Sequence, residues 1–191
     1  MKVITVRKSI GMASFEDSTE LFLTKAIELM PVAEQNRSLV IYGASQIEER
    51  LIDLVDAFFS HGHPNPGRRR DLVGYVFRSS WCGFNSKIQL AKMIAERVEI
   101  HDAKWRKDFG NLLMDVMQYR NKFAHGAMAT DGKKVALSSF ISKPTTDILT
   151  DQWLSRIEAD LGVAYDQVQE VFDHLMSSYE LHPIIQHPIN P

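Results

Sequence analysis

A stripe of apolar residues at helical spacing is the feature that most constrains how this chain folds. Between residues 102 and 125 the stripe comprises Phe109, Leu112, Val116 and Phe123, which share one face of an α-helix that Asp102 is expected to start. Arg120 falls on that same face. A guanidinium there needs a partner, a ligand or a wet cavity, unless its stem packs and its head reaches the surface. The stripe predicts a long core helix with an unusual arginine.

A second segment, residues 35–60, is apolar on two faces. One face carries Ile47, Leu51, Leu54 and Phe58, and the other carries Ile41, Ile52, Val55 and Phe59. Such a helix lies at the centre of a bundle or at a subunit interface. Glu48 interrupts the second face, and we predict that this carboxylate pairs with and orients Arg120. A local pair with Arg50 and simple exposure of Glu48 are the alternatives.

Local signals predict the remaining elements. A helix is expected over residues 15–30, ended by Pro31, and a short helix over 71–79. Asn85 or Ser86 is expected to cap a helix that ends near Val98. Asp131-Gly132 predicts a hairpin with a type I′ turn between residues 126–130 and 133–141. Thr150 or Asp151 caps a closing helical region, with Gly162 as the candidate break point.

These elements predict a mainly α fold, an antiparallel helical bundle with a small β-hairpin after the helix that bears the stripe. The 191 residues are 45% hydrophobic, enough to fill one core. We therefore expect a single domain over residues 1–181, with its core at about 35–125, the hairpin at 126–143 and the closing helices at 150–181. The proline-containing tail, residues 182–191, is expected to be extended.

Composition limits the function classes. A net charge of −2 gives no global electrostatic reason for non-specific nucleic-acid binding, so DNA binding is unexpected and any RNA contact would be local. Cys82 is the only cysteine, which excludes a disulfide framework and favours a cytoplasmic setting. No apolar run approaches the ~18–20 residues of a membrane span, and the first residues lack a signal-peptide pattern.

The candidate chemistry lies in residues 120–126, RNKFAHG, called here the signature segment. On a regular helix Arg120 and His125 would lie roughly 140° apart. They converge only if the helix tightens or ends between them, or if a second subunit completes the site. Gly126 fits the first route, because glycine is the usual residue just past a helix end. Alternatively, His125 is a helix-end histidine that interacts with the last carbonyls.

The signature segment resembles the Arg-x4-6-His motif of the HEPN superfamily of small all-helical domains. Residues 43–59, GASQIEERLIDLVDAFF, are similar to the opening helix of several HEPN branches. Residues 84–94, FNSKIQLAKMI, are similar to the second helix of the branch that contains the mannitol operon repressor. The resemblance covers residues 38–125 and no motif is matched after Gly126. It implies a HEPN-like helical bundle.

Many HEPN proteins are metal-independent ribonucleases that act as toxins or in antiviral defence. The resemblance implies a homodimer in which two signature segments face each other, with no metal and no other cofactor. His125 would take the 2′-hydroxyl proton, Arg120 would hold the scissile phosphate, and Asn121 would orient the substrate or His125. The products would carry 2′,3′-cyclic phosphate ends. An inhibiting antitoxin or regulatory protein is expected, because a free ribonuclease would damage its host.

Four basic residues are candidates for RNA contacts: Lys122, Arg68, Arg69 and Arg70. A solvated loop is the alternative for the three consecutive arginines. His61 and His63 have no third ligand placed by the sequence, so no metal site is predicted.

Two other function classes remain open. The first is a non-catalytic regulator similar to the mannitol operon repressor, in which the signature segment is structural, Glu48 caps Arg120 and His125 is covered. The second is a dimeric protein-interaction module that uses the hairpin and the proline tail as contact surfaces.

Overall fold

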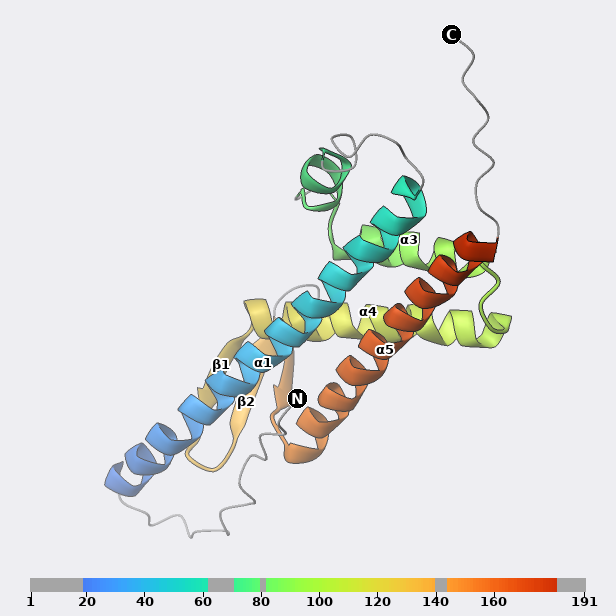
Figure 1. The fold of residues 1–191 in the computed structure, drawn as a ribbon. Coiled ribbons are helices and arrows are strands. Elements are labelled where there is room, and N and C mark those ends of the chain that lie inside the picture. Colours follow the sequence, from blue (N-terminus) through green and yellow to red (C-terminus); the bar gives the residue numbers. More distant parts are fainter. Residues whose placement is uncertain (1–18, 62–70, 80–81, 140–143, 182–191) are drawn as a thin grey trace, which may run out of the picture. The chain divides into compact units, whose positions relative to one another are not determined.

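The computed structural model describes residues 19–61, 71–79, 82–139 and 144–181, with side chains between residues 25 and 179 of these ranges. Its helices are α1 (Thr19–Ser60), the π-helical turn η1 (Leu72–Phe77), α3 (Phe84–Arg97), α4 (Ala103–His125) and α5 (Asp151–Leu181). Its strands are β1 (Ala127–Thr130), β2 (Val135–Ser139) and β3 (Thr145–Ile148) (Figure 1). The predicted mainly helical fold with a small sheet is confirmed.

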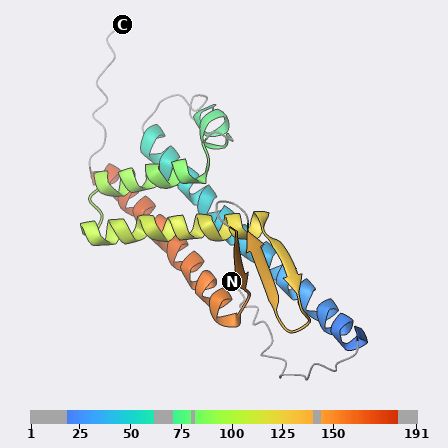
Figure 2. The ribbon, with the colours of Figure 1, turned by 180° about the vertical axis from the view of Figure 1, so that it is seen from behind.

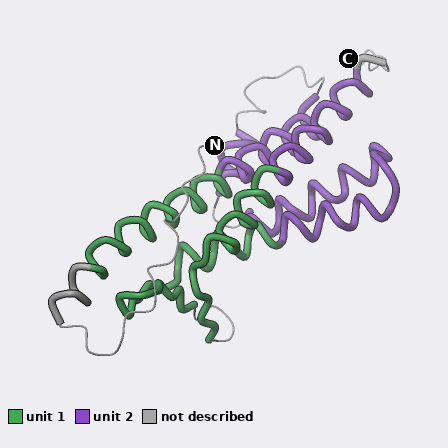
Figure 3. Tube along the Cα trace, turned by 90° about the horizontal axis from the view of Figure 1, so that it is seen from below, with its two compact units in different colours: residues 1–45, 115–162 green, residues 46–114, 163–191 purple. Residues whose placement is uncertain are grey.

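The chain divides into two compact units, shown in Figure 3. Unit 1 comprises Met1–Ser45 and Asp115–Gly162, and unit 2 comprises Gln46–Met114 and Val163–Pro191. Helices α1, α4 and α5 therefore each contribute residues to both units. The signature segment belongs to unit 1, together with the sheet.

The core of unit 1 is built by α1, α4, α5 and the central strand. Its buried apolar residues include Ala33, Val40 and Ala44 of α1, Val116 and Phe123 of α4, Val135 and Leu137 of β2, and Ile157 and Leu161 of α5. The ring of Phe123 stacks on Trp153, with 5.7 Å between the centroids. Because Phe123 belongs to the signature segment, this packing fixes the last turns of α4 against the first turns of α5.

Strands β1, β2 and β3 form an antiparallel sheet in that order, and Figure 2 shows α4 leading directly into its first strand. The predicted hairpin is confirmed, but its type I′ turn is wrong. Thr130 lies opposite Val135, so four residues connect the strands, and only Gly132 among them has a positive φ, of 78°. A type I′ turn needs two such residues. Strand β3 was not predicted.

The carboxylate of Asp131 organises this connection instead. Its Oδ1 accepts the backbone N–H groups of Lys133 and Lys134, both at 2.9 Å. These two hydrogen bonds favour the ionised carboxylate and lower the pKa of Asp131. Aspartate favours turns because its side chain can accept hydrogen bonds from the backbone of the same turn. The Asp-Gly pair therefore predicted the position of the turn correctly but not its type.

The helix boundaries correct three predictions. Pro31 lies inside α1 and does not end it. Its side chain is exposed, and the buried residues that follow it, Ala33 and Val40, keep the helix packed. Helix α3 begins at Phe84 after Gly83, without a side-chain cap from Asn85 or Ser86. Helix α5 runs unbroken through Gly162, where nothing crowds the glycine.

Two caps and the short helix are confirmed. Oδ1 of Asp102 accepts the N–H of Trp105 at 2.7 Å at the start of α4. The hydroxyl of Thr150 accepts the N–H of Trp153 at 3.2 Å at the start of α5. The short helix predicted over residues 71–79 is η1. Each of these features depends on neighbouring residues only.

The core of unit 2 uses both apolar faces of the second half of α1. Its buried residues include Ile47, Leu51, Ile52, Leu54 and Val55 of α1, Ile88, Ala91 and Ile94 of α3, Phe109 and Leu113 of α4, and Val168, Val171 and Leu175 of α5. Two-sided burial of α1 was predicted, but Phe59 is half exposed and Phe58 and Ile41 are only partly buried.

Candidate functional site

Arg120 lies on the last two turns of α4 and is half-buried. Its Nη1 donates a hydrogen bond of 3.0 Å to Oδ1 of Asn121. Among the residues that the structure describes, no carboxylate lies within ion-pair distance of this guanidinium. Arg120 is thus a half-buried arginine whose hydrogen-bond partner among the described residues is a neutral amide, and its role as a phosphate-binding residue stays a prediction.

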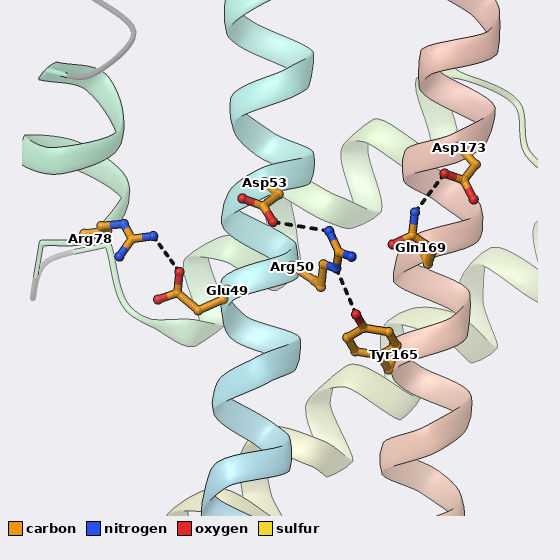
Figure 4. A network of polar contacts seen from close by, with 7 residues as sticks. All are labelled: Glu49, Arg50, Asp53, Arg78, Tyr165, Gln169 and Asp173. Atoms are coloured by element: carbon orange, nitrogen blue, oxygen red, sulfur yellow. Dashed lines mark hydrogen bonds and ion pairs between the residues drawn. The ribbon is translucent and has the colours of Figure 1, made fainter. Parts of the chain in front are cut away.

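Two arginines of unit 2 have acidic or phenolic partners. Arg78 donates to Glu49 at 2.6 Å, and Arg50 donates to Tyr165 at 3.1 Å and to Asp53 at 3.5 Å (Figure 4). The hydrogen bond from Arg50 to Tyr165 is the main reason why the pKa of Arg50 is raised. Arg120 differs from these structural arginines because its partner is a neutral amide.

His125 is the last residue of α4, and its side chain is exposed. His125 forms no hydrogen bond or ion pair with the described residues. The alternative in which it interacts with the last carbonyls of the helix is therefore not supported by a hydrogen bond. The N–H of Gly126 donates to the carbonyl of Lys122 at 2.8 Å, which is a regular α-helical bond. Helix α4 thus neither tightens nor ends between Arg120 and His125, and the first route to their convergence is wrong. In one copy the two side chains leave the helix about 140° apart.

Gly126 has a different role from the one predicted. It is buried and is not among the glycines with a positive φ, so it is not the left-handed residue that usually follows a helix. A Cβ at this position would overlap the carbonyl oxygen of Lys122 and would lie 2.6 Å from Cδ1 of Leu137. The glycine is required because β2 approaches the end of α4 closely.

Arg37 of α1 is a site residue that the sequence did not indicate. Its Nη2 donates to the carbonyl oxygen of Ala124 at 3.1 Å, and its Nη1 lies 3.7 Å from Glu34. A cation at the carbonyl end of a helix is favourable, because the last carbonyls lack partners within the helix. Arg37 and Ala124 are 87 positions apart, and no local pattern distinguishes Arg37 from a surface arginine.

Lys122, a predicted RNA contact, is paired with Asp147 of β3 at 2.8 Å. Both side chains are about 30% exposed (29% and 30%), so the pair is open to solvent and to a competing anion. An RNA phosphate would have to replace the carboxylate or share the ammonium with it. The contact of Lys122 with RNA stays a prediction, and Asp147 is a partner that the sequence did not reveal because β3 was not predicted.

Tyr119 precedes Arg120 and donates its hydroxyl hydrogen to Oδ2 of Asp160 at 2.8 Å. Burial and then the hydrogen bond to this carboxylate raise the pKa of Tyr119 to about 12. This contact ties the signature-bearing part of α4 to α5 within unit 1.

Glu48 belongs to unit 2, where its Oε1 accepts a hydrogen bond of 2.6 Å from Nζ of Lys87 on α3. The two side chains are 23% and 6% exposed, respectively. Glu48, predicted to interrupt an apolar face, is partly buried, and its partner inside unit 2 is Lys87, not Arg50. Arg120 belongs to unit 1, so a pairing between Glu48 and Arg120 stays a prediction. Lys87 lies on the apolar face of α3 beside Phe84, Ile88 and Ala91, a signal that the sequence did contain.

The other predicted residues add no built site. Arg68, Arg69, Arg70 and His63 lie outside the described residues. His61 is exposed and stacks on the ring of Tyr179, with 3.8 Å between the centroids. Within the described ranges, no group of three or more His, Cys, Asp or Glu side chains is placed to hold a metal ion.

A groove of about 530 Å³ lies in unit 2, lined by residues that include Ile100, His101, Glu170 and His174. His101 contacts Glu170 at 2.8 Å, and Nε2 of His174 contacts the carbonyl of Val98 at 3.1 Å. None of the predicted catalytic or RNA-binding residues lines this groove.

Comparison with known proteins gives no match for this chain among family models, curated proteins or solved structures. No helix in the part of the chain that the structure describes is long and apolar enough to cross a membrane.

Proposed function

We propose that this protein is a metal-independent endoribonuclease of the HEPN type, a toxin or antiviral-defence effector that cleaves RNA to 2′,3′-cyclic phosphate ends. One observation carries the proposal. At the end of α4, Arg120 is half-buried and has no carboxylate partner among the described residues. Five positions later, His125 is exposed and forms no hydrogen bond or ion pair with the described residues. An arginine open to an anion and a histidine open to a proton are the two groups that this reaction needs.

In this reaction the imidazole of His125 takes the proton of a 2′-hydroxyl group. The 2′-oxygen attacks the adjacent phosphorus, the bond to the 5′-oxygen breaks, and the departing oxygen takes up a proton. The guanidinium of Arg120 binds the non-bridging oxygens and stabilises the charge that develops on them. Asn121 accepts from Arg120, so its proposed role is to orient the guanidinium.

The regular geometry of α4 places a condition on the site. Because Arg120 and His125 of one copy diverge by about 140°, the proposed site combines Arg120 of one copy with His125 of another. Two copies related by a two-fold axis form two such sites. The proposed homodimer is thus part of the mechanism, and an antitoxin that covers the end of α4 would block both sites.

The test is cleavage of a mixed tRNA and mRNA pool in EDTA, with end-group analysis of the products. Wild-type protein should leave 2′,3′-cyclic phosphates, and Arg120→Ala and His125→Ala should each lower the rate by about 10²–10⁴-fold. Arg156→Ala and His101→Gln serve as controls and should cleave normally, since Arg156 is an exposed residue that pairs with Asp160 and His101 pairs with Glu170. Full activity in either signature variant, or no cleavage by pure wild-type protein, would contradict the proposal.

One observation favours a second candidate function, a protein-interaction module. Phe59 and Tyr75 of unit 2 are 50% and 76% exposed, and large apolar side chains on a surface often mark binding sites. A pull-down partner lost on Tyr75→Ala but not on His125→Ala would support this reading. The regulator alternative predicted a covered His125, whereas His125 is exposed.

A further inference from the structure

We infer that Arg37 of α1 is a second phosphate-binding arginine, which acts beside Arg120 on the RNA backbone. This inference rests on the proposed function and extends its site to a residue 83 positions before Arg120 in the sequence. It adds a binding residue, and it leaves proton transfer to His125.

Arg37 and Arg120 both lie at the C-terminal end of α4. Ala124 follows Arg120 by four residues, so both lie on the same face, one turn apart. Arg37 donates to the carbonyl oxygen of Ala124 at 3.1 Å and therefore reaches the last turn of α4, one turn beyond Arg120. All three residues belong to unit 1.

The positive charge of Arg120 and Arg37 is largely uncompensated within the described residues. Arg120 has only the amide of Asn121 as a hydrogen-bond partner there. The nearest carboxylate of Arg37 is Glu34 at 3.7 Å, whose side chain is 52% exposed; such a surface pair contributes little. Lys122 differs because Asp147 lies at 2.8 Å. Two arginines at one helix end with little opposing charge attract an anion.

The side chain of Arg37 is 26% exposed, so part of its guanidinium is open to a ligand while one N–H group holds Ala124. Guanidinium groups match the oxygens of a phosphate with paired N–H donors. A phosphodiester next to the scissile bond can therefore bind at Arg37 while the scissile phosphate binds at Arg120. Such contacts position a strand without reading its sequence.

The experiment measures binding of a 2′-O-methyl RNA oligonucleotide, which cannot be cleaved, by fluorescence anisotropy over a range of salt concentrations. Arg37→Gln should weaken binding about tenfold and should lower the salt-dependence slope by about one. Arg37→Lys should keep the slope, because it keeps the charge. Arg156→Gln is the matched control in unit 1 and should bind like wild type.

Glu34→Gln gives a second test that does not disturb the contact with Ala124. Removing this exposed carboxylate leaves Arg37 with more of its charge free, so binding should tighten about twofold. This variant tests the inference even if Arg37→Gln fails to fold. Unchanged affinity in Glu34→Gln, together with an unchanged or unfolded Arg37→Gln, would overturn it.

The outcomes separate the inference from the proposed function. If wild type binds and cleaves RNA and Arg37→Gln binds equally well with the same salt slope, the inference fails and the ribonuclease stands. If wild type binds but does not cleave, and Arg37→Gln binds more weakly with a smaller slope, the inference stands and the ribonuclease fails. If wild type does not bind RNA, both fail.

Discussion

At the residue scale, Gly126 is the position at which the signature segment tolerates least change. A Cβ there would meet the carbonyl of Lys122 and the side chain of Leu137, so Gly126→Ala forces the end of α4 and its contact with β2 to shift. We expect a loss of stability of about 1–3 kcal/mol, the usual range for overpacking. Gly162→Ala is the matched control: it adds a methyl group in open space within α5 and should raise stability by about 0.5–1 kcal/mol. Urea unfolding of both variants measures the difference, and a Gly126→Ala variant as stable as wild type would refute the close approach.

Tyr119 makes a prediction about alkaline stability. Burial and Asp160 raise its pKa to about 12, whereas an unfolded tyrosine ionises near 10. Between these pH values the unfolded chain loses the proton and the folded chain keeps it, so the stabilising contribution of Tyr119 is present below pH 10 and is lost as the pH rises towards 12. Urea unfolding at pH 8 and pH 11 should therefore show a larger loss of stability for wild type than for Tyr119→Phe. Equal losses would show that the raised pKa is absent.

The site also shows which residues a sequence reveals. Arg120 could be predicted as a half-buried cation because helical spacing alone places it on an apolar face. Asp102 and Thr150 could be predicted as caps because their partners are three residues away. Arg37 could not, because its partner, Ala124, is a backbone carbonyl far along the chain, and side-chain patterns carry no information about it.

At the scale of elements, the pair between Lys87 of α3 and Glu48 of α1 joins two helices of unit 2. Lys87 is almost fully buried, so Glu48→Gln leaves a buried ammonium group without its carboxylate. We expect this change to cost about 2 kcal/mol.

Glu49→Gln is the control for this pair, because it removes an exposed partner of Arg78 and should cost less than about 1 kcal/mol. Chemical denaturation of the two variants compares a buried ion pair with an exposed one at adjacent positions. Equal stability losses would mean that Lys87 is not held by Glu48 in solution.

Element boundaries were predictable where local chemistry decides them and unpredictable where packing does. Pro31 removes one helical hydrogen bond from α1, a local signal for a helix end. The buried residues that follow it, Ala33 and Val40, keep the helix continuous. Gly162 likewise lowers the local helix propensity of α5. The burial of its neighbours Leu161 and Ala164 stabilises the helix despite this.

At the scale of the whole molecule, the proposed function depends on the number of copies. The fold class could be predicted because helical periodicity pervades the sequence. The relative direction of the Arg120 and His125 side chains could not be predicted, because it depends on whether α4 ends before or after the histidine. Because α4 runs through His125, a site that uses both residues calls for two copies of the chain.

The most direct measurement of this claim is complementation between two inactive variants. Arg120→Ala and His125→Ala are purified separately, mixed under conditions that exchange subunits, and assayed for cyclic-phosphate ends in EDTA. If each site takes Arg120 from one copy and His125 from the other, half of the dimers are mixed and each of these has one intact site. About a quarter of the wild-type activity should therefore be recovered. No recovery after exchange, with both variants folded and dimeric, would contradict it.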